Sequence, residues 1–520
     1  MRKKKQALLL IVVITFIFIL TGSYFNNYNL LKQPPSETWS KEVQLGSGGQ
    51  KNSPVIIKET ERLLTAYEDT KKLKICETDL NGKILRTEEY EVNEELLKNV
   101  VFTKSSDGYI LMYNSSKSGQ GYLENIILDK DLNVVNRKIV EGVEHTYQID
   151  SSNIVISYND KIEVVNTLED KSSSVMVEEL SMVTASASKD GLLVCYLEKD
   201  EFFKAVTFKD GIASKPILVT SIVKPEKISY NNMSSSTDGK YGYILIEEYV
   251  RNEYALTKLM EFPIDGGETK ISTLSVDDSK YIVNTKGSYS EDGGKFYATM
   301  SRAFGKKEVQ QAIISFVIKD GQASNIEVVT RLRELCIHPY SDEDYIGFLS
   351  FKEENVYNVN IASTNQEFKV ENNVSRGTEK RTALFYMLEG VMVSVSYIII
   401  LGFRWIIPVL VIGGAVTFID YSFSEKKKKI VYVILSAVGI IAKTYVIVNM
   451  FYGTYVSMLP NVIAPIAIGI SICLLIGGIV YGYGYFVYVD DFEGIFIGKF
   501  SIFMLMDALL SLMVFVPLIA

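Results

Sequence analysis

A short segment that recurs along the chain constrains the fold more than any other feature of the sequence. Ser234 to Ile246, SSSTDGKYGYILI, joins a polar turn at Asp238-Gly239 to a run of aromatic and β-branched residues. Glycine supplies, and aspartate tolerates, the positive φ of a tight turn, so this combination strongly indicates a hairpin. Further full copies lie at Ser105 to Tyr113, Ser188 to Tyr196 and Ser290 to Met300.

Weaker copies complete an array of seven, at Glu61 to Tyr67, Ser151 to Tyr158 and Asp342 to Ser350. Equivalent points lie near residues 61, 106, 151, 190, 238, 292 and 343, so the spacing runs from 39 to 54 residues. Each copy continues with a strand-like run, a turn and another such run, and one more run precedes it. Four antiparallel strands at a period of about 40 to 50 residues are typical of β-propeller blades.

The repeated quartets resemble the degenerate Ser-x-Asp-Gly repeats of the β-propeller superfamily, in its WD40-like and TolB-like forms, over residues 38 to 375. These quartets are Ser105-Asp107-Gly108, Ser188-Asp190-Gly191, Ser236-Asp238-Gly239 and Ser290-Asp292-Gly293. The resemblance implies architecture only, because propellers host unrelated functions. We therefore predict an all-β seven-bladed β-propeller over residues 41–375.

The ends of the ring must also be joined, because a propeller has to cover its exposed strand edges. We expect Trp39 to Leu45 to pair with the last blade. The following Gly46-Ser47-Gly48-Gly49 run has the composition of a phosphate loop but no Lys-Ser/Thr after it, so it is interpreted as a flexible linker.

Charge is unevenly distributed along the chain. The formal net charge is −8, whereas Arg2 to Lys5 carry +4, residues 376–381 carry +2 and residues 382–520 balance, which leaves −14 for residues 6–375. An acidic domain of this size argues against nucleic-acid binding, which needs a basic surface. Solubility of an exposed domain is the favoured interpretation, with a basic or cationic ligand as the alternative.

Apolar segments flank the predicted propeller. Basic Met1 to Gln6 precedes apolar Ala7 to Leu20, which predicts a signal peptide or a retained signal anchor over residues 1–24, followed by a linker over 25–40. In either case the positive flank stays in the cytoplasm and the propeller is exported to the extracellular side. High Lys, Ile, Asn and Tyr usage with little Cys suggests a bacterial source.

Residues 376–520 predict a multi-pass membrane bundle of four or five helices. Spanning candidates are Ile406 to Ile419, Ile430 to Met450, Val462 to Val487 and Ile495 to Ile519. If Leu384 to Leu401 also spanned, Lys426 to Lys429 would lie outside, against the positive-inside rule. We therefore expect Thr382 to Phe403 to lie at the interface or in a re-entrant hairpin, which keeps Lys426 to Lys429 cytoplasmic.

Residues suited to catalysis or metal binding are scarce. The chain has two histidines and four scattered cysteines, Cys76, Cys195, Cys336 and Cys473, with no hydrolase, metal or nucleotide motif. No catalytic, metal or cofactor residue is predicted, and each cysteine is expected to be buried as a small apolar side chain. His145 and His338, with Asp342 and Asp344, form a candidate ligand site lining the channel; ordinary, partly exposed histidines are the alternative.

Two charges fall inside apolar segments, Lys443 and Asp507, and intramembrane charges usually mark a partner or a pathway. An ion pair that fixes helix packing is favoured over a proton or substrate relay. Gly478 and Gly482 make a G-x-x-x-G pattern, with Gly477 and Gly484 beside them, that favours close helix approach. Tyr481, Tyr483, Tyr485 and Tyr488 predict an interfacial belt.

The function expected from these features is a binding, scaffold or sensor subunit of a cell-envelope membrane complex. Its partners would be a membrane or envelope protein and the lipid bilayer, with a small ligand as a further candidate. The predicted ligand surfaces are loops at Tyr230 to Thr237 and His338 to Asp344. A permease-like transporter with a propeller cap is the first alternative, and an envelope hydrolase or lyase is the second.

Overall fold

The computed structural model describes residues 2–520 except 70–71, 93–97, 118–119, 223–224, 278, 305–307, 332–334, 421–423, 457–458, 460–461, 491–495 and 519–520. The chain divides into two compact units. One comprises residues 33–302 and 309–374, and the other comprises 1–32, 303–308 and 375–520.

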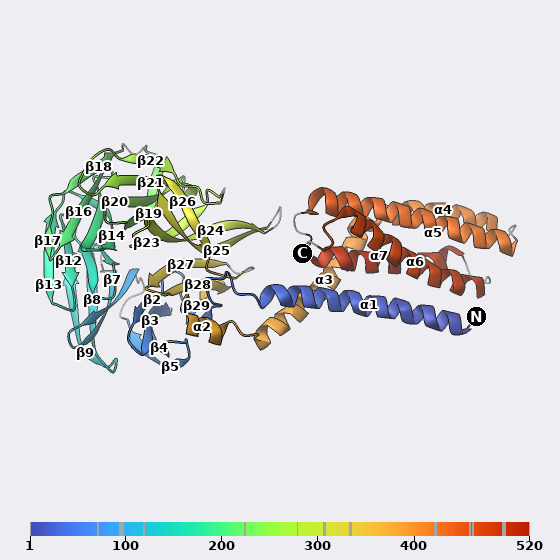
Figure 1. The fold of residues 1–520 in the computed structure, drawn as a ribbon, viewed down its shortest axis with the longest axis horizontal. Helices are drawn as coiled ribbons and strands as arrows, with labels where there is room; N and C mark the ends of the chain where they lie inside the picture. Colours follow the sequence, from blue (N-terminus) through green and yellow to red (C-terminus); the bar gives the residue numbers. More distant parts are fainter. Residues whose placement is uncertain are drawn as a thin grey trace. The chain divides into compact units, whose positions relative to one another are not determined.

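The first unit is a seven-bladed β-propeller of antiparallel sheets, as the repeat predicts (Figure 1); six sheets have four strands and the fourth blade has five. Blades 1 to 3 contain β2 (Val55–Lys58), β3 (Arg62–Asp69), β4 (Lys72–Asp79), β5 (Ile84–Glu91); β6 (Lys98–Ser105), β7 (Gly108–Lys117), β8 (Gln120–Asp129), β9 (Val134–Glu141); and β10 (His145–Gln148), β11 (Asn153–Ser157), β12 (Lys161–Asn166), β13 (Lys171–Met176).

Blades 4 to 7 follow the same order. Blade 4 contains β14 (Leu180–Ser188), β15 (Gly191–Glu198) and β16 (Phe202–Lys209), and β16 pairs with both β17 (Ile212–Ala213) and β18 (Ile217–Ser221). Blade 5 contains β19 (Ile228–Thr237), β20 (Tyr241–Val250), β21 (Glu253–Pro263) and β22 (Lys270–Thr273), and blade 6 contains β23 (Ile282–Ser288), β24 (Gly294–Phe304), β25 (Glu308–Lys319) and β26 (Gln322–Val328). Blade 7 contains β27 (Cys336–Asp342), β28 (Tyr345–Glu353), β29 (Val356–Ser363) and β1 (Val43–Gly48).

Ring closure is confirmed: β1 forms the outer strand of blade 7 and pairs antiparallel with β29, from Val43 opposite Ile361 to Gly48 opposite Tyr357. The flexible-linker prediction is wrong for Gly46 to Gly48, which belong to this strand. A Cβ on Gly46 would meet the Tyr67 hydroxyl, and one on Gly48 would meet the backbone oxygen of Glu68. These glycines therefore allow close packing on blade 1, which the sequence pattern alone does not reveal.

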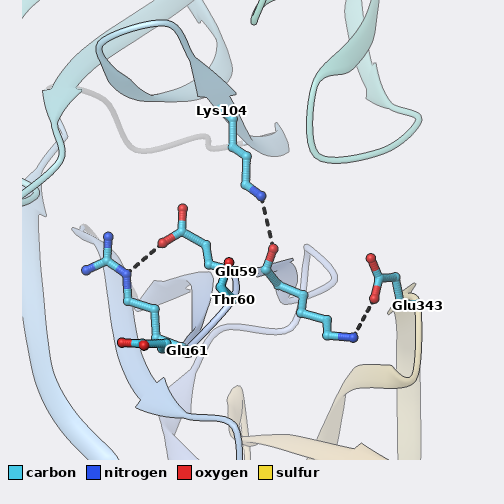
Figure 2. Close-up of a pocket in the computed structure, with 7 residues that line it drawn as sticks. Glu59, Thr60, Glu61, Lys104 and Glu343 are labelled. Carbon is cyan, nitrogen blue, oxygen red and sulfur yellow. Dashed lines mark hydrogen bonds and ion pairs between the residues drawn. The ribbon is translucent and has the colours of Figure 1, made fainter.

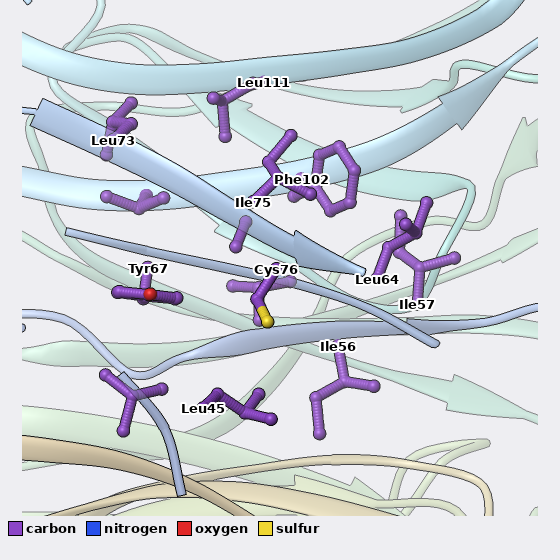
Figure 3. Packing of buried hydrophobic residues seen from close by; sticks show 14 of the residues in the cluster. Leu45, Ile56, Ile57, Leu64, Tyr67, Leu73, Ile75, Cys76, Phe102 and Leu111 are labelled. Atoms are coloured by element: carbon purple, nitrogen blue, oxygen red, sulfur yellow. The ribbon is translucent and has the colours of Figure 1, made fainter. Parts of the chain in front are cut away.

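Apolar side chains fill the spaces between blades. In the largest propeller cluster, Leu45 of β1 packs with Ile56, Tyr67 and Leu73 of blade 1 and Leu111 of blade 2 (Figure 3). Facing sheets bury alternate side chains against both neighbours, and this explains why blade strands are apolar on both sides. All four cysteines are buried, as predicted, and none of them takes part in a disulfide.

The second unit is helical. It contains α1 (Arg2–Leu31), α3 (Gly377–Gly402), α4 (Ile406–Asp420), α5 (Glu425–Ile447) with a π-helical end (Val448–Tyr452), α6 (Ile466–Asp490), α7 (Phe496–Phe515) and a final 3-10 turn (Val516–Leu518), whereas the short α2 (Gln366–Asn372) belongs to the propeller unit. Within the described part of the chain, five helices are long and apolar enough to cross a membrane: Gln6–Leu31, Gly377–Gly402, Glu425–Tyr452, Ile466–Val489 and Ile497–Phe515.

The helix lengths differ from the prediction around residue 403. The predicted interfacial segment belongs to a helix of 26 residues, α3, whereas the predicted span after it forms the shorter apolar helix Ile406–Val416. α3 begins earlier than composition suggests because the carboxylate of Glu379 accepts the backbone N–H of Arg376 and caps the first turn. The N-terminal helix likewise continues to Leu31, beyond the predicted anchor boundary at residue 24.

Helix packing brings other side chains close to two of the four predicted glycines, Gly477 and Gly484. A Cβ on Gly478 or Gly482 would meet nothing within 4 Å, whereas one on Gly477 would meet Ile440 and one on Gly484 would meet Phe503. The tyrosine belt prediction is wrong for Tyr481 and Tyr488, which are 4% and 2% exposed in the helical core. Aromatic stacking, with Tyr481 on Phe500 and Tyr488 on Tyr432, accounts for this burial.

Removing the Trp39 side chain tests the ring closure. Trp39 is 2% exposed and packs between blades 6 and 7, edge-on to Tyr297. We expect Trp39→Ala to lower the unfolding free energy of the propeller by about 3 to 5 kcal/mol, because the neighbours cannot fill the cavity. Pulse proteolysis of the full chain in urea measures this.

Phe351→Ala is the matched control, because Phe351 lies in blade 7, one of the two blades that Trp39 contacts, and is 49% exposed. Its effect should stay below about 1 kcal/mol, in the range of surface substitutions. Equal losses in the two variants would show that Trp39 has no special part in closing the ring.

Candidate functional site

The topology places two sets of turns on one face of the propeller. The first strands of successive blades contact one another around the ring and so surround its axis. Strand direction alternates within a blade, so the turns from first to second strand and from third to fourth strand open on the same side. We call this side the turn face, defined by residues 59–61, 80–83, 106–107, 130–133, 149–152, 167–170, 189–190, 210–211, 238–240, 264–269, 289–293, 320–321 and 343–344.

Contacts between distant turns support this arrangement. The Lys189 ammonium of blade 4 lies 3.0 Å from the Glu291 carboxylate of blade 6. In blade 1, Arg62 donates to the backbone oxygen of Lys130, which lies in a third-to-fourth-strand turn of blade 2.

Charge on the turn face is strongly one-sided. Its turns contain four basic residues, Lys83, Lys130, Lys189 and Lys240, and seventeen acidic ones: Glu59, Glu61, Asp107, Asp131, Asp150, Glu169, Asp170, Asp190, Asp210, Asp238, Asp265, Glu268, Glu291, Asp292, Asp320, Glu343 and Asp344. The described residues of the connections on the opposite face contain nine acidic residues against six basic ones. Most of the propeller's negative charge therefore lies on the turn face.

A cavity of about 840 Å³ opens on this face where blades 1, 2 and 7 meet (Figure 2). Its walls are Lys58, Glu59, Thr60, Glu61 and Arg62 of blade 1, Lys104 of blade 2 and Glu343 of blade 7. Because these side chains come from strand ends of a rigid ring, the cavity is a fixed feature of the fold.

Two basic groups of the cavity wall, those of Arg62 and Lys58, form ion pairs with neighbouring carboxylates. Arg62 donates to Glu59 at 2.7 Å, to Glu77 at 3.0 Å and to the Tyr109 hydroxyl at 2.8 Å. Burial opposes ionisation of Glu59, but hydrogen bonds from Tyr109 and Arg62 outweigh it and lower the pKa of this carboxyl. The Lys58 ammonium binds Glu343 at 2.5 Å.

Lys104 and Asp342 complete the wall and the floor. The Lys104 ammonium donates to the backbone oxygen of Lys58 at 3.0 Å, as Figure 2 shows. The Asp342 carboxylate accepts the backbone N–H of Lys58 at 2.8 Å, and burial raises the pKa of Asp342 to about 6.

The structure divides the predicted ligand residues between two places. Asp342 and Asp344 lie at the turn-face end of β27, beside the cavity, and Asp344 approaches Lys58 at 3.9 Å. His145 is exposed at the opposite end of its strand, 3.3 Å from the Asn99 side chain. His338 lies near the start of β27, against the backbone of Gln50, where burial lowers its pKa to about 4.

A repeated backbone irregularity explains the position of His338. First strands shift register between Lys98 and Val101, Tyr230 and Met233, Val283 and Lys286, and Ile337 and Tyr340. Asn99, Asn284 and His338 adopt positive φ of 51°, 52° and 55° within these bulges. Asparagine and histidine tolerate this conformation better than most residues, so the backbone itself accounts for a histidine here.

The two segments predicted to be ligand-binding loops belong largely to strands. Tyr230 to Thr237 belongs to β19, and His338 to Asp342 belongs to β27. Sequence reasoning therefore missed Lys58, Glu59, Arg62 and Lys104, whose proximity depends on blade packing.

The buried carboxyl group of Glu247, in blade 5, contacts the bulge in the first strand of blade 6. It accepts the backbone N–H of Asn284 at 2.7 Å and the side-chain amide of Asn232 at 2.8 Å. The residue is 2% exposed, and burial raises its pKa to about 7. This interblade contact therefore contains a carboxyl group that titrates near neutral pH.

The helical unit contains a second polar cluster. The Lys443 ammonium lies 2.6 Å from the Asp507 carboxylate and 3.0 Å from both the Ser511 hydroxyl and the Cys473 backbone oxygen. Lys443 and Asp507 are 0% and 1% exposed, so the pairing favoured from the sequence is present inside the bundle. All three ammonium protons have acceptors, which is the arrangement expected of a packing contact.

Among the described residues, no group of three or more histidine, cysteine, aspartate or glutamate side chains is placed to hold a metal ion. The acidic turns instead bind their own backbone: the Asp129 carboxylate accepts the N–H groups of Asp131 and Asn133 at 2.9 and 2.8 Å. These are Asx turns, in which the carboxylate stabilises the turn itself.

No protein-family model and no curated protein matches the chain. Solved structures do match, among them the WD40 domain of Toxoplasma gondii coronin, with TM-score 0.37, 11% identity and coverage of 64% of this chain and 90% of that one. BBS1N in complex with ARL6DN has TM-score 0.39 and 9% identity, with 63% and 98% coverage. The β-propeller domain of the Trilobed protease from Pyrococcus furiosus has TM-score 0.36 and 10% identity, with 63% and 98% coverage.

Glu247 provides a pH test of the interblade contact. Because burial raises its pKa from 4.5 to about 7, its contribution to stability is complete below pH 4.5 and is lost as the pH rises through 7. We expect the unfolding free energy of the wild type, relative to Glu247→Gln, to fall by about 3 kcal/mol between these limits.

Pulse proteolysis of both proteins across this pH range gives the difference. Glu253→Gln in the same blade is the control, because Glu253 is exposed. Parallel profiles for the wild type and Glu247→Gln would contradict the raised pKa.

Substitutions at the buried ion pair test its packing role. We expect Lys443→Met or Asp507→Asn alone to destabilise the full chain by about 3 to 5 kcal/mol, because each leaves an uncompensated buried charge. Lys443→Met combined with Asp507→Leu should recover most of this loss. Thermal unfolding in detergent, followed by size-exclusion chromatography, measures all three, and a double variant as unstable as the worse single one would contradict a simple pair.

Proposed function

We propose that this chain is a membrane-anchored binding protein whose propeller takes a protein partner on its turn face. The observation that carries the proposal is the cavity of about 840 Å³ formed by three blades on that face. Rigid elements that present loops and a concave site are suited to recognition. The described residues of this face form ion pairs and Asx turns that hold the turns in place, as a rigid binding surface requires.

The membrane part of the proposal rests on the five long apolar helices. If these span and the shorter Ile406–Val416 does not, the chain crosses five times, and Arg2 to Lys5 and Lys426 to Lys429 share one side. This arrangement satisfies the positive-inside rule with both basic segments in the cytoplasm, and it puts the propeller outside. A span over α3 therefore agrees with a cytoplasmic position of Lys426 to Lys429, provided that α4 does not also span.

In this proposal the helices act as an anchor and as the contact with a membrane complex. The Lys443 ammonium has three acceptors inside the bundle, which supports a fixed pair over a transport relay. The partner would be an envelope or membrane protein that reaches the extracellular side.

Photo-crosslinking in intact cells tests the proposed surface. A benzophenone amino acid replaces Thr60 at the cavity or Ser106 on the neighbouring turn, both of which are exposed. The same group in place of exposed Asn159, on the opposite face, is the control. We expect one partner polypeptide to be captured from Thr60 and Ser106 at least tenfold more than from Asn159.

Equal capture from both faces, or no capture from either turn-face position, would contradict the assignment. Flux measurements on proteoliposomes complement the experiment, because an anchor should produce no substrate or ion flux.

A further inference from the structure

The wall of the cavity holds its basic groups in internal contacts, whereas several turns of the same face carry acidic groups without such partners. Arg62 is bound by Glu59 and Glu77, and Lys58 is bound by Glu343. By contrast, the exposed carboxylates of Glu61, Asp107 and Asp292 have no ion-pair partner within the part of the chain that the structure describes. The lining of the cavity balances three basic residues against three acidic ones, so the negative charge lies on the turns around it.

Glu261 of blade 5 provides an independent observation at the same face. It lies two residues before the turn-face end of β21 and is only 4% exposed. Its Oε2 atom is buried without a hydrogen-bond partner, and no described residue forms an ion pair with it. A buried carboxylate without a donor is costly, and such an atom in a native fold calls for an explanation.

The surroundings of Glu261 contain more negative charge. The Tyr243 hydroxyl donates to Asp238 at 3.0 Å, and Glu261 and Asp320 also act electrostatically on this hydroxyl. Burial, followed by these three carboxylates, raises the pKa of Tyr243. Three carboxylates from blades 5 and 6 thus act on one phenol, and Lys270, directly opposite Glu261 on β22, forms no ion pair with it in the described structure.

We propose that the turn face recognises a basic polypeptide segment, with lysine or arginine side chains placed over its acidic turns and toward Glu261. The inference deepens the proposed function and rests on it, because it names the chemistry of the protein partner. Seventeen acidic against four basic turn residues attract such a segment over the whole face, and a concave acidic surface raises its association rate. The same field repels nucleic acids and anionic lipid surfaces.

Binding of a defined probe tests this chemistry. Fluorescein-labelled octalysine is titrated with the full chain in detergent at low salt, and fluorescence anisotropy is recorded, with octaglutamate as the opposite-charge probe. We expect saturable binding of octalysine that weakens as salt is added, and none of octaglutamate. Equal binding of both probes would overturn the proposal.

Two quadruple variants with the same change in net charge separate a local effect from a general one. The turn-face variant carries Glu61→Gln, Asp107→Asn, Asp292→Asn and Asp344→Asn. The matched control carries Glu144→Gln, Asp160→Asn, Glu226→Gln and Glu354→Gln, all exposed on the opposite face. We expect the turn-face variant to raise the Kd for octalysine about tenfold and the control less than about twofold. Equal increases would overturn the proposal.

Glu261→Gln examines the buried carboxylate by thermal unfolding. Octalysine should raise the unfolding midpoint of the wild type, and this shift should fall to half or less in Glu261→Gln. An undiminished shift would remove Glu261 from the site.

The crosslinking experiment distinguishes failure of this inference from failure of the proposed function. If Thr60 still captures its partner in the turn-face quadruple variant, the protein-binding function stands and the basic chemistry is wrong. If octalysine binds the turn face as expected but neither Thr60 nor Ser106 captures a polypeptide, the face is cation-selective and the proposed protein-binding function is wrong.

Discussion

The antiparallel pairing of β1 with β29 is the interaction on which the rest of the propeller depends. Successive blades pack sheet against sheet, and only this pairing completes the outer edge of blade 7. It also brings Trp39 between blades 6 and 7 and places Glu42 in an ion pair with Arg331. The cavity on the turn face needs the closed ring, because its walls come from blades 7, 1 and 2.

The blade count could be predicted because its signals are local. Asp-Gly turns with positive φ, such as Gly239 at 87° and Gly321 at 77°, follow from the backbone freedom of glycine and need no distant partner. Predictions failed where the cause was distant in sequence. Gly46 and Gly48 are strand residues because blade 1 approaches them closely, and His338 belongs to a bulge rather than to the Asp342 site.

The candidate site was predictable only in part for the same reason. Asp342 and Asp344 were identified from their position in a turn, but Lys58, Arg62 and Lys104 join them through the arrangement of three blades. The negative charge of the turn face could be predicted only in part from the sequence. Every one of its acidic residues is visible in the sequence, yet their placement on one face follows only from the alternation of strand direction within each blade.

Buried charges in the two units are stabilised in different ways. In the helical unit, Lys443 and Asp507 neutralise each other in contact, which removes the need for water or a ligand. In the propeller, the carboxyl group of Glu247 accepts hydrogen bonds and becomes protonated near neutral pH, whereas Glu261 has neither a donor nor a cation among the described residues. The first two arrangements are complete within the fold. Glu261 is not, and it lies at the end of the propeller where acidic turns would bring a basic group from outside. In the proposed function, the unpartnered carboxylate and the negative turn face have one physical explanation, a basic segment of the partner.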